Sequence, residues 1–272
     1  MPILIGREAD IRTDLESRTG GWTGWRPFRI TAKYPESEVI TSFILSPVDN
    51  LPVLAHRPGQ YLTLRLGLAD GIEIKRNYSI SCAPNNQDYR ISVKLEPNGQ
   101  GGSRFLHEAT EIGDIIEITP PAGDFYLPDE PERPVVLLSA GVGLTPMVSI
   151  LETIGMHYPD VETHYVHGAL NSRTHAMGPH IHKIARQHGN MSVATFYSAP
   201  DPQDKPGVTH DLTGYISTDW LKDNTPFSKA DFFLCGPKPF LRKMVNDLHT
   251  QGVSHDQIHY EIFGPTDDEI AA

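Results

Sequence analysis

The sequence predicts two compact domains, an antiparallel β-barrel followed by an α/β domain built on a parallel sheet. Its 272 residues are a little under twice the length of roughly 150 residues that is typical of one domain. Between residues 20 and 127 apolar and polar residues mostly alternate, whereas after residue 134 short apolar runs alternate with helix-like segments. The first pattern is typical of half-buried strands. The second is typical of parallel strands covered by helices.

Composition and charge exclude several other classes of protein. Hydrophobic residues make up 39% of the chain and charged residues 21%, which is enough apolar material to form cores. The net charge of −11 argues against a nucleic-acid coat or a protein that binds anionic membranes. Two cysteines, Cys82 and Cys235, are too few for a disulfide framework, a four-cysteine zinc site or a four-cysteine iron–sulfur cluster. Because no secretory signal opens the chain and the 13 histidines show no zinc-protease spacing, we expect a cytoplasmic protein without a metal site.

The first twenty residues predict a short amphipathic helix, because Leu4, Ile11 and Leu15 fall on one helical face. A helix of this length is marginal by itself. Either it docks on the barrel, or it belongs to a domain that this chain does not contain.

The barrel strands are expected between clusters of turn residues. Apolar and polar side chains alternate over residues 62–66 and 91–95, and turns rich in Asn, Gly and Pro occupy residues 83–86 and 97–102. Short strands separated by turns indicate an antiparallel sandwich or barrel. One helix is expected over residues 103–110, with Phe105 and Leu106 facing the barrel.

A linker at residues 131–134 separates the barrel from the α/β pattern. The expected strands of the second domain are residues 135–139, 163–167, 192–197, 231–235 and 258–263, and its expected helices are residues 145–156, 180–188 and 239–251. The uncharged stretch over residues 134–151 could reach across a bilayer on length alone. Polar residues, glycines and a proline interrupt it in the middle, so it is better interpreted as a buried strand that feeds a helix. We therefore expect a helix over residues 1–20 and domains over residues 21–130 and 131–272.

The junction between the first strand and helix of the α/β domain has the composition of a phosphate-binding turn. Gly141 and Gly143 allow the backbone to turn tightly and to approach a pyrophosphate. Thr145 is expected to cap the following helix, and Pro146 suits its first position. The N–H groups at the helix start would then face the phosphates. Because Pro146 replaces the third glycine of G-x-G-x-x-G, a purely structural turn is the alternative.

A second motif, Arg76-Asn77-Tyr78-Ser79-Ile80-Ser81, lies near the end of a predicted barrel strand. Arg76, Tyr78 and Ile80 are expected on one face of that strand. Arg76 could hold a phosphate through charge-assisted hydrogen bonds, Tyr78 offers a flat ring for stacking, and Ser79 offers a hydroxyl to a ring nitrogen. An ordinary strand with an exposed arginine explains the hexapeptide equally well when it is taken alone.

Two further turns are candidate ligand contacts. Residues 99–103, Gly-Gln-Gly-Gly-Ser, lead into a helix with Ser103 at its cap, which is either a phosphate nest or a flexible surface turn. Residues 232–237, Phe-Phe-Leu-Cys-Gly-Pro, form a buried strand that ends at the expected ligand edge of the sheet. Cys235 is as consistent with a packed small side chain as with a reactive thiol.

These motifs, in this order, resemble those of the ferredoxin–NADP reductase superfamily, and most of all the reductase region of flavohaemoglobin. The R-x-Y-S, G-G-S, G-x-G-x-T-P and C-G-P elements are all present. Further similar segments are residues 21–28, 36–42, 57–61, 120–125 and 258–265, and residues 3–9 resemble the end of the last globin helix. The resemblance implies an antiparallel Greek-key barrel that binds FAD, an α/β domain that binds NAD(P)H, and NAD(P)H-dependent flavin reductase activity.

The resemblance also implies roles for individual residues. FAD would be held by Tyr61, Arg76, Asn77, Tyr78, Ser79, Gly102 and Ser103, and the nicotinamide nucleotide by Ala140, Gly141, Val142, Gly143, Leu144 and Thr145 together with Cys235, Gly236 and Pro237. Ile262, Phe263, Gly264 and Pro265 would lie against the flavin. The residues implied in catalysis are Tyr78, which would stack on the flavin ring, Ser79 near its reactive nitrogen, and Glu261, which would tune electron transfer. Ala140 stands where relatives often have glycine.

The cofactor preference and the electron acceptor are left open by the sequence. No acidic residue follows the strand 163–167, and Arg173 could accept the 2′-phosphate of NADPH or be a solvated loop residue. The resemblance implies that electrons pass to the haem of a globin, as in nitric oxide detoxification, or to another one-electron acceptor. The globin would be on another chain, or the protein is a separated reductase domain. The alternatives are a non-catalytic electron-transfer or regulatory subunit, and the reductase component of an oxygenase, a class that commonly carries an iron–sulfur module.

Overall fold

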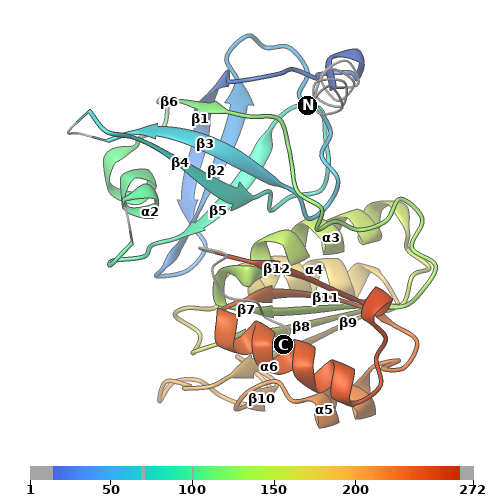
Figure 1. The fold of residues 1–272 in the computed structure, drawn as a ribbon. Coiled ribbons are helices and arrows are strands. Elements are labelled where there is room, and N and C mark those ends of the chain that lie inside the picture. The colour runs from blue at the N-terminus through green and yellow to red at the C-terminus, as the bar shows by residue number, and fades with distance from the viewer. Residues whose placement is uncertain (1–14, 69–70, 100, 264–272) are drawn as a thin grey trace.

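The computed structural model describes residues 15–68, 71–99 and 101–263, and these residues form two six-stranded sheets (Figure 1). The first sheet is antiparallel and the second is parallel with helices on both faces, so the predicted fold class is confirmed. Within the described part of the chain, no helix is both long and apolar enough to cross a bilayer. The predicted helix over residues 1–20 lies largely outside the described residues, which begin at Leu15.

The antiparallel sheet has the strand order β4-β3-β6-β1-β2-β5. Its strands are β1 (Arg26–Pro35), β2 (Ile40–Pro47), β3 (Tyr61–Gly67), β4 (Glu73–Ser79), β5 (Tyr89–Lys94) and β6 (Ile115–Ile118). A bridge between Ile80 and Ile91 joins the end of β4 to β5 and closes the sheet into a barrel. Alternate side chains such as Phe28, Ile30 and Leu64 point inward and are fully buried, as the period of two predicts.

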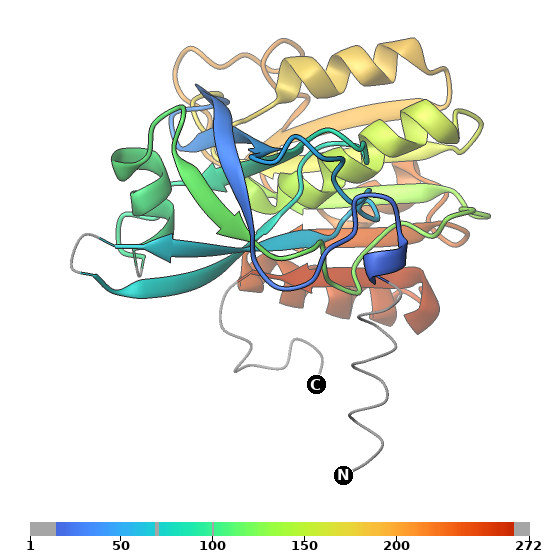
Figure 2. The ribbon, with the colours of Figure 1, turned by 90° about the horizontal axis from the view of Figure 1, so that it is seen from above.

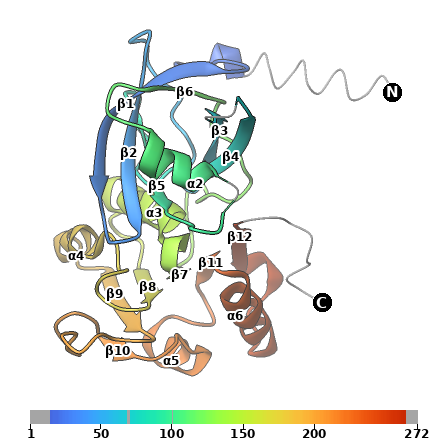
Figure 3. The same ribbon diagram turned by 90° about the vertical axis from the view of Figure 1, so that its left-hand side faces the viewer.

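A short helical segment covers one end of the barrel (Figure 3). It consists of α2 (Gly102–Arg104), which continues into the π-helical turn η1 (Phe105–Ala109). Leu106 is fully buried in the barrel core and Phe105 packs against it, so the predicted orientation of this segment is confirmed.

The parallel sheet has the strand order β10-β9-β8-β7-β11-β12. Its strands are β7 (Val135–Ala140), β8 (Thr163–Ala169), β9 (Met191–Tyr197), β10 (Leu212–Thr213), β11 (Asp231–Gly236) and β12 (Ile258–Ile262), and its helices and helical turns are η2 (Gly141–Gly143), α3 (Leu144–His157), α4 (Gly178–Gln187), α5 (Thr218–Asn224), α6 (Lys238–Thr250) and η3 (His255–Gln257). The order reverses at β7, because β8 lies on one side of β7 and β11 on the other. In an open α/β sheet such a reversal leaves a crevice at the carboxyl ends of the strands.

The two faces of the parallel sheet form separate cores. Val136 and Leu138 pack with side chains of α5 and α6, whereas Val135 and Leu137 pack with side chains of α3 and α4. Because both faces are covered, the central strands β7 and β11 carry runs of consecutive apolar residues, at residues 135–138 and 232–235. This explains the two uninterrupted apolar runs of the sequence.

Helix α3 lies between the barrel and the parallel sheet (Figures 1 and 2). Ile40 of β2 and Phe125 and Leu127, which follow β6, belong to the same apolar cluster as the buried side chains of α3. This apolar contact places the start of β3 and the end of β4 near the carboxyl edge of the parallel sheet.

Candidate functional site

The first part of the candidate site lies on β4, beside the start of α2. Arg76 and Tyr78 are on the same face of β4, and both are partly buried. A Cβ atom added to Gly102 would lie 2.8 Å from Arg76 Cγ and 3.0 Å from Tyr78 Oη. Glycine is therefore required for α2 to approach these two side chains so closely. Burial raises the pKa of Tyr78 to about 12, so the ring carries a neutral hydroxyl.

The second part of the candidate site is the end of β4 and its neighbour in β3. Tyr61, the first residue of β3, is the register partner of Ser79, the last residue of β4. Ser79 is 5% exposed, whereas Tyr61 is partly exposed and lies beside the backbone of Gly123, where an added Cβ would lie 2.9 Å from the ring. A tyrosine ring and a buried hydroxyl thus stand side by side at the open end of the barrel.

Glu261 of β12 meets Ser79 across the junction between the two sheets. Ser79 Oγ donates a hydrogen bond of 3.4 Å to Glu261 Oε2. Burial raises the pKa of Glu261 to about 7, although the hydrogen bond from Ser79 favours the ionised form. Near neutral pH this carboxyl group is therefore able to take up or release a proton, which is the property expected of a general acid or base.

Cys235 lies beside Glu261 because the two residues are register partners in β11 and β12. Its side chain is fully buried. Burial, and then the nearby carboxylate of Glu261, raise the pKa of the thiol well above its ordinary value. A buried protonated thiol is inert, so the geometry favours a packing role for the Cys235 side chain.

The predicted phosphate-binding turn packs against the end of β11. After β7 the chain turns at Gly141, with φ +54°, into η2 and then directly into α3. A Cβ atom at Gly143 would lie 2.1 Å from the carbonyl oxygen of Cys235, and one at Gly236 would lie 3.2 Å from the Ala140 backbone nitrogen. The two glycine turns are therefore in direct backbone contact. The sequence motifs at residues 140–145 and 235–237 are brought together at the crevice of the sheet.

Two of the predicted capping interactions are wrong. Helix α3 begins at Leu144, its N-cap is Gly143, and the Thr145 hydroxyl donates instead to the carbonyl oxygen of Val142 at 3.1 Å. The helix begins earlier because η2 continues into it without an extended residue between them. At α2 the cap is Gly101, and the hydroxyl of Ser103 accepts a hydrogen bond of 3.1 Å from the backbone N–H of Glu96.

Other predicted site residues present their side chains elsewhere or are not described. Asn77 accepts a hydrogen bond from Thr63 on the exposed face of β4, and the Leu144 side chain is fully buried with α3. Pro237 is the N-cap of α6. Val142 and Phe263 pack on the edge of the apolar cluster around α3, and Ile262 ends β12 beside Gly236. Gly264 and Pro265 lie outside the described residues.

The residues present fit FAD and a nicotinamide dinucleotide. Gly102 brings the start of α2 directly against a cation and an aromatic ring, a combination that suits a phosphate next to a planar ring system. Gly141, beside which an added Cβ would meet nothing within 4 Å, leaves space next to the start of the 14-residue helix α3 at the crevice, where backbone N–H groups and the helix dipole favour phosphate. Within the described ranges, no cluster of three or more His, Cys, Asp or Glu side chains has the arrangement of a metal site.

A polar cluster at the domain junction, not anticipated from the sequence, holds the barrel to α3. Glu152 of α3 accepts hydrogen bonds of 2.7 Å from the Ala83 backbone N–H and from Arg90 of β5, and its Oε1 also lies 2.7 Å from His180 Nε2. Burial by itself would raise the pKa of Glu152, but the His180 hydrogen bond and the Arg90 charge bring it below its ordinary value. The sequence signal was available, since Glu152 is the first charge after the uncharged stretch of residues 134–151.

A second group of junction contacts surrounds Ser149 of α3. Its hydroxyl donates to the carbonyl oxygen of Cys82 at 2.7 Å, and His56 Nε2 lies 3.2 Å from the same hydroxyl oxygen. Burial lowers the pKa of His56 to about 4, so its ring is neutral at physiological pH. The junction is therefore a fixed polar contact made from both domains.

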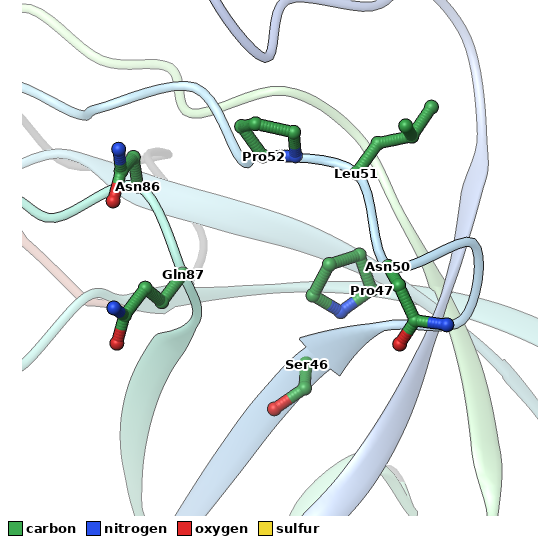
Figure 4. Close-up of a pocket in the computed structure, with 7 residues that line it drawn as sticks. All are labelled: Ser46, Pro47, Asn50, Leu51, Pro52, Asn86 and Gln87. Carbon is green, nitrogen blue, oxygen red and sulfur yellow. The ribbon is translucent and has the colours of Figure 1, made fainter.

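A shallow surface pocket opens on the barrel (Figure 4). It is lined by Ser46, Pro47, Asn50, Leu51, Pro52, Asn86 and Gln87. None of the candidate cofactor residues takes part in it, so it belongs to a different part of the barrel surface.

Two family models match the chain. The oxidoreductase FAD-binding domain matches residues 27–126, and the oxidoreductase NAD-binding domain matches residues 137–246. The first match covers the barrel, and the second covers most of the parallel sheet.

Curated relatives and solved structures agree with these matches. A flavohemoprotein of Xylella fastidiosa is 53% identical over 270 residues, and the aligned region is 99% of this chain and 66% of the relative, so the chain spans about two thirds of its length. A flavohemoprotein of Chromobacterium violaceum is 40% identical over 97% of this chain and 67% of the relative. The flavohem-like FAD/NAD-binding domain of nitric oxide dioxygenase from Vibrio cholerae is 35% identical, with a TM-score of 0.80, over 88% of this chain and 99% of that domain.

Proposed function

Because the chain belongs to the flavohaemoprotein family, whose FAD- and NAD-binding oxidoreductase region it matches, we propose that it passes electrons from NAD(P)H through FAD to the haem of a globin. It is an NAD(P)H-dependent flavin oxidoreductase by family. The globin as acceptor and nitric oxide as the final substrate are proposals. They are supported by the relatives named flavohemoprotein and by the similar FAD/NAD-binding domain of nitric oxide dioxygenase from Vibrio cholerae.

The observation that carries this function is the contact between Ser79 and Glu261, which joins the end of barrel strand β4 to the carboxyl edge of the parallel sheet. A flavin site and a nicotinamide site must adjoin for hydride transfer. The two sets of candidate residues adjoin at this pair. FAD, when bound, supplies the conversion between a two-electron hydride donor and a one-electron acceptor.

The residues of this chain have distinct proposed tasks. Arg76 and Tyr78, with the backbone of Gly102 directly beside them, hold FAD together with Tyr61. The turn over residues 140–145 and the Gly236 turn hold the nicotinamide nucleotide at the crevice. Phe263 excludes water from the junction, where it packs against the apolar cluster that contains the buried side chains of α3.

Ser79 and Glu261 are proposed to handle the proton. With a pKa of about 7, Glu261 holds a proton in part of the molecules at neutral pH and can exchange it with Ser79 Oγ at 3.4 Å. We further propose that residues 21–130 form the FAD-binding unit and residues 131–272 the nucleotide-binding unit. The cytoplasmic location remains a prediction from the sequence.

The proposed acceptor is tested by supplying it separately. We expect the purified flavin-loaded chain to oxidise NAD(P)H with an artificial one-electron acceptor, and to reduce an added ferric globin under anaerobic conditions. Reduction of the artificial acceptor without any reduction of the globin would support the reductase and reject the globin. Failure with both acceptors would favour the alternative of a non-catalytic subunit.

A further inference from the structure

Arg173 lies in the loop that follows strand β8, and β8 is the neighbour of the strand that leads into the phosphate-binding turn. Ala140 at the end of β7 is the register partner of Gly168 in β8. In sheets that bind dinucleotides, the residues after the second strand meet the adenosine ribose and discriminate its 2′-hydroxyl from a 2′-phosphate. Arg173 is therefore in the position where a cation would select NADPH.

The guanidinium of Arg173 is already occupied by carboxylates. Its Nε donates to Asp201 Oδ2 at 2.6 Å and its Nη2 donates to Asp201 Oδ1 at 3.3 Å, which is the two-pronged geometry that arginine otherwise offers to a phosphate. Its third nitrogen, Nη1, lies 3.9 Å from Glu38 Oε2 in the turn between β1 and β2. The side chain of Arg173 is 53% exposed and that of Asp201 is 18% exposed, so the pair is at the surface but its acid is held in place.

A second acid fixes the loop that carries Asp201. Asp204 Oδ2 accepts hydrogen bonds from the backbone N–H groups of Asp201 at 2.9 Å and of Ser172 at 3.2 Å. Desolvation opposes ionisation of Asp204, but the hydrogen bonds from Ser172 lower its pKa below the ordinary value. The guanidinium of Arg173 therefore contacts the Asp201 carboxylate, lies near that of Glu38, and is also within the electrostatic reach of Asp204. The three carboxylates of Asp201, Asp204 and Glu38 outnumber the two cations of this region, Arg173 and Lys205, so its net charge is negative.

We propose that the Arg173–Asp201 pair makes this site select NADH over NADPH, an inference that rests on the proposed nucleotide site. Asp201 is a positioning residue, because it holds the guanidinium that would otherwise bind a 2′-phosphate. Asp201, Asp204 and Glu38 also repel that phosphate, which carries close to two negative charges at neutral pH. NADH has a free 2′-hydroxyl, so it neither needs the guanidinium as a phosphate ligand nor is repelled by the carboxylates. The adenosine end of the site, rather than the nicotinamide end, thus sets the preference.

The test compares two adenosine fragments that lack the nicotinamide. Calorimetry on the flavin-loaded protein should show that 5′-AMP binds about tenfold more tightly than 2′,5′-ADP. Asp201→Asn keeps the shape and an acceptor oxygen but removes the charge, and should reverse or abolish this ratio by strengthening 2′,5′-ADP binding. The effect should be clearly smaller in the Arg173→Gln background, because the guanidinium that would bind the phosphate is then missing and only the lost repulsion from Asp201 remains.

A second variant and a kinetic measurement distinguish a change in nucleotide selectivity from a general disturbance of the structure. Glu38→Gln leaves the two-pronged contact intact and should shift the ratio in the same direction, but by less. In steady-state assays the Asp201→Asn change should appear in KM for NADPH rather than in kcat. Equal binding of the two fragments by the wild type, or an unchanged ratio in Asp201→Asn, overturns this inference alone. If wild type binds neither fragment nor NADH, the proposed nucleotide site is rejected and this inference with it.

Discussion

Ser79 Oγ lies 3.4 Å from Glu261 Oε2, and this hydrogen bond joins the last residue of barrel strand β4 to strand β12 of the parallel sheet. Burial at the junction raises the pKa of Glu261 to about 7. The same carboxyl group lies beside the buried thiol of Cys235. The place where the two sheets meet is therefore the place where a proton is easily exchanged.

The elevated pKa of Glu261 predicts a pH-dependent stability. An ordinary glutamate ionises near pH 4.5 in the unfolded chain, whereas Glu261 ionises near pH 7 in the folded protein. Between these values the unfolded state binds fewer protons, so the free energy of unfolding falls as pH rises. The Glu261→Gln variant has no carboxyl group to ionise, so its unfolding free energy should not fall in this way. The difference in unfolding free energy between Glu261→Gln and wild type should therefore rise by on the order of 3 kcal/mol from pH 4.5 to pH 8, as measured by urea denaturation.

A neighbouring variant checks the cause of this effect. Ser79→Ala removes the hydrogen bond that favours the ionised form of Glu261. The pH window over which stability falls should therefore extend upward in Ser79→Ala. The same stability difference between Glu261→Gln and wild type at pH 4.5 and pH 8 would show that Glu261 has an ordinary pKa.

Arg76→Ala should weaken FAD binding. Loss of one charge-assisted hydrogen bond to a phosphate costs about 1.5–3 kcal/mol, which corresponds to a roughly 10- to 150-fold higher Kd. Flavin content after gel filtration and fluorescence titration of the stripped protein measure this change. Lys75→Ala is the matched control, because Lys75 is the adjacent exposed cation and contacts the ring of Trp25 on the barrel surface. If Arg76→Ala retains stoichiometric flavin with unchanged affinity, Arg76 has no part in the site.

Gly143→Ala should destabilise the parallel-sheet domain. The added Cβ would lie 2.1 Å from the Cys235 carbonyl oxygen, and both partners are backbone, so neither can move without separating η2 from β11. We expect a loss of about 3 kcal/mol in unfolding free energy and weaker nucleotide binding. Gly67→Ala, where nothing lies within 4 Å, should change stability by less than about 1 kcal/mol. Comparable losses in both variants would contradict the packing account.

Glu152→Gln should loosen the junction between the barrel and α3. The neutral side chain leaves Arg90, whose side chain is 15% exposed, without its 2.7 Å carboxylate partner. Breaking such a buried pair costs roughly 3 kcal/mol. Glu162→Gln, which removes an exposed partner of His164, should cost less than about 1 kcal/mol.

The effect of Glu152→Gln should also depend on pH. Because the pKa of Glu152 is lowered in the folded state, its stabilising contribution is present above pH 4.5 and is lost as the pH falls toward the folded value. The cost of Glu152→Gln should therefore shrink at low pH. A cost that does not change between pH 7 and pH 4 would contradict the buried ion pair.

The fold class could be predicted because periodicity reports burial directly. The alternation over residues 62–66 marks strand β3, and the apolar run over residues 135–139 marks a central parallel strand. The motifs at residues 76–79 and 140–145 are local, so they were found as well. Thr145 and Ser103 were assigned wrongly as caps, because the exact first residue of a helix depends on how the preceding turn packs.

Contacts between distant segments could not be predicted. The pairing of Arg173 with Asp201 depends on how the chain returns after β9, and without it Arg173 is indistinguishable from a solvated arginine or a phosphate ligand. The role of Glu152 exists only once the barrel docks on α3. The contact of Arg173 leaves no trace in periodicity, composition or short motifs, and for Glu152 the sequence shows only that a charge ends the uncharged stretch of residues 134–151.

The central claim is that the junction at Ser79 and Glu261 places a flavin next to a nicotinamide. The most direct measurement is an anaerobic titration of the purified, flavin-loaded chain with NADH, followed by visible absorption. We predict that the flavin band is lost in proportion to the NADH added, with rapid hydride transfer. A chain that binds flavin and NADH yet leaves the band unchanged, or that binds no flavin, would contradict this claim.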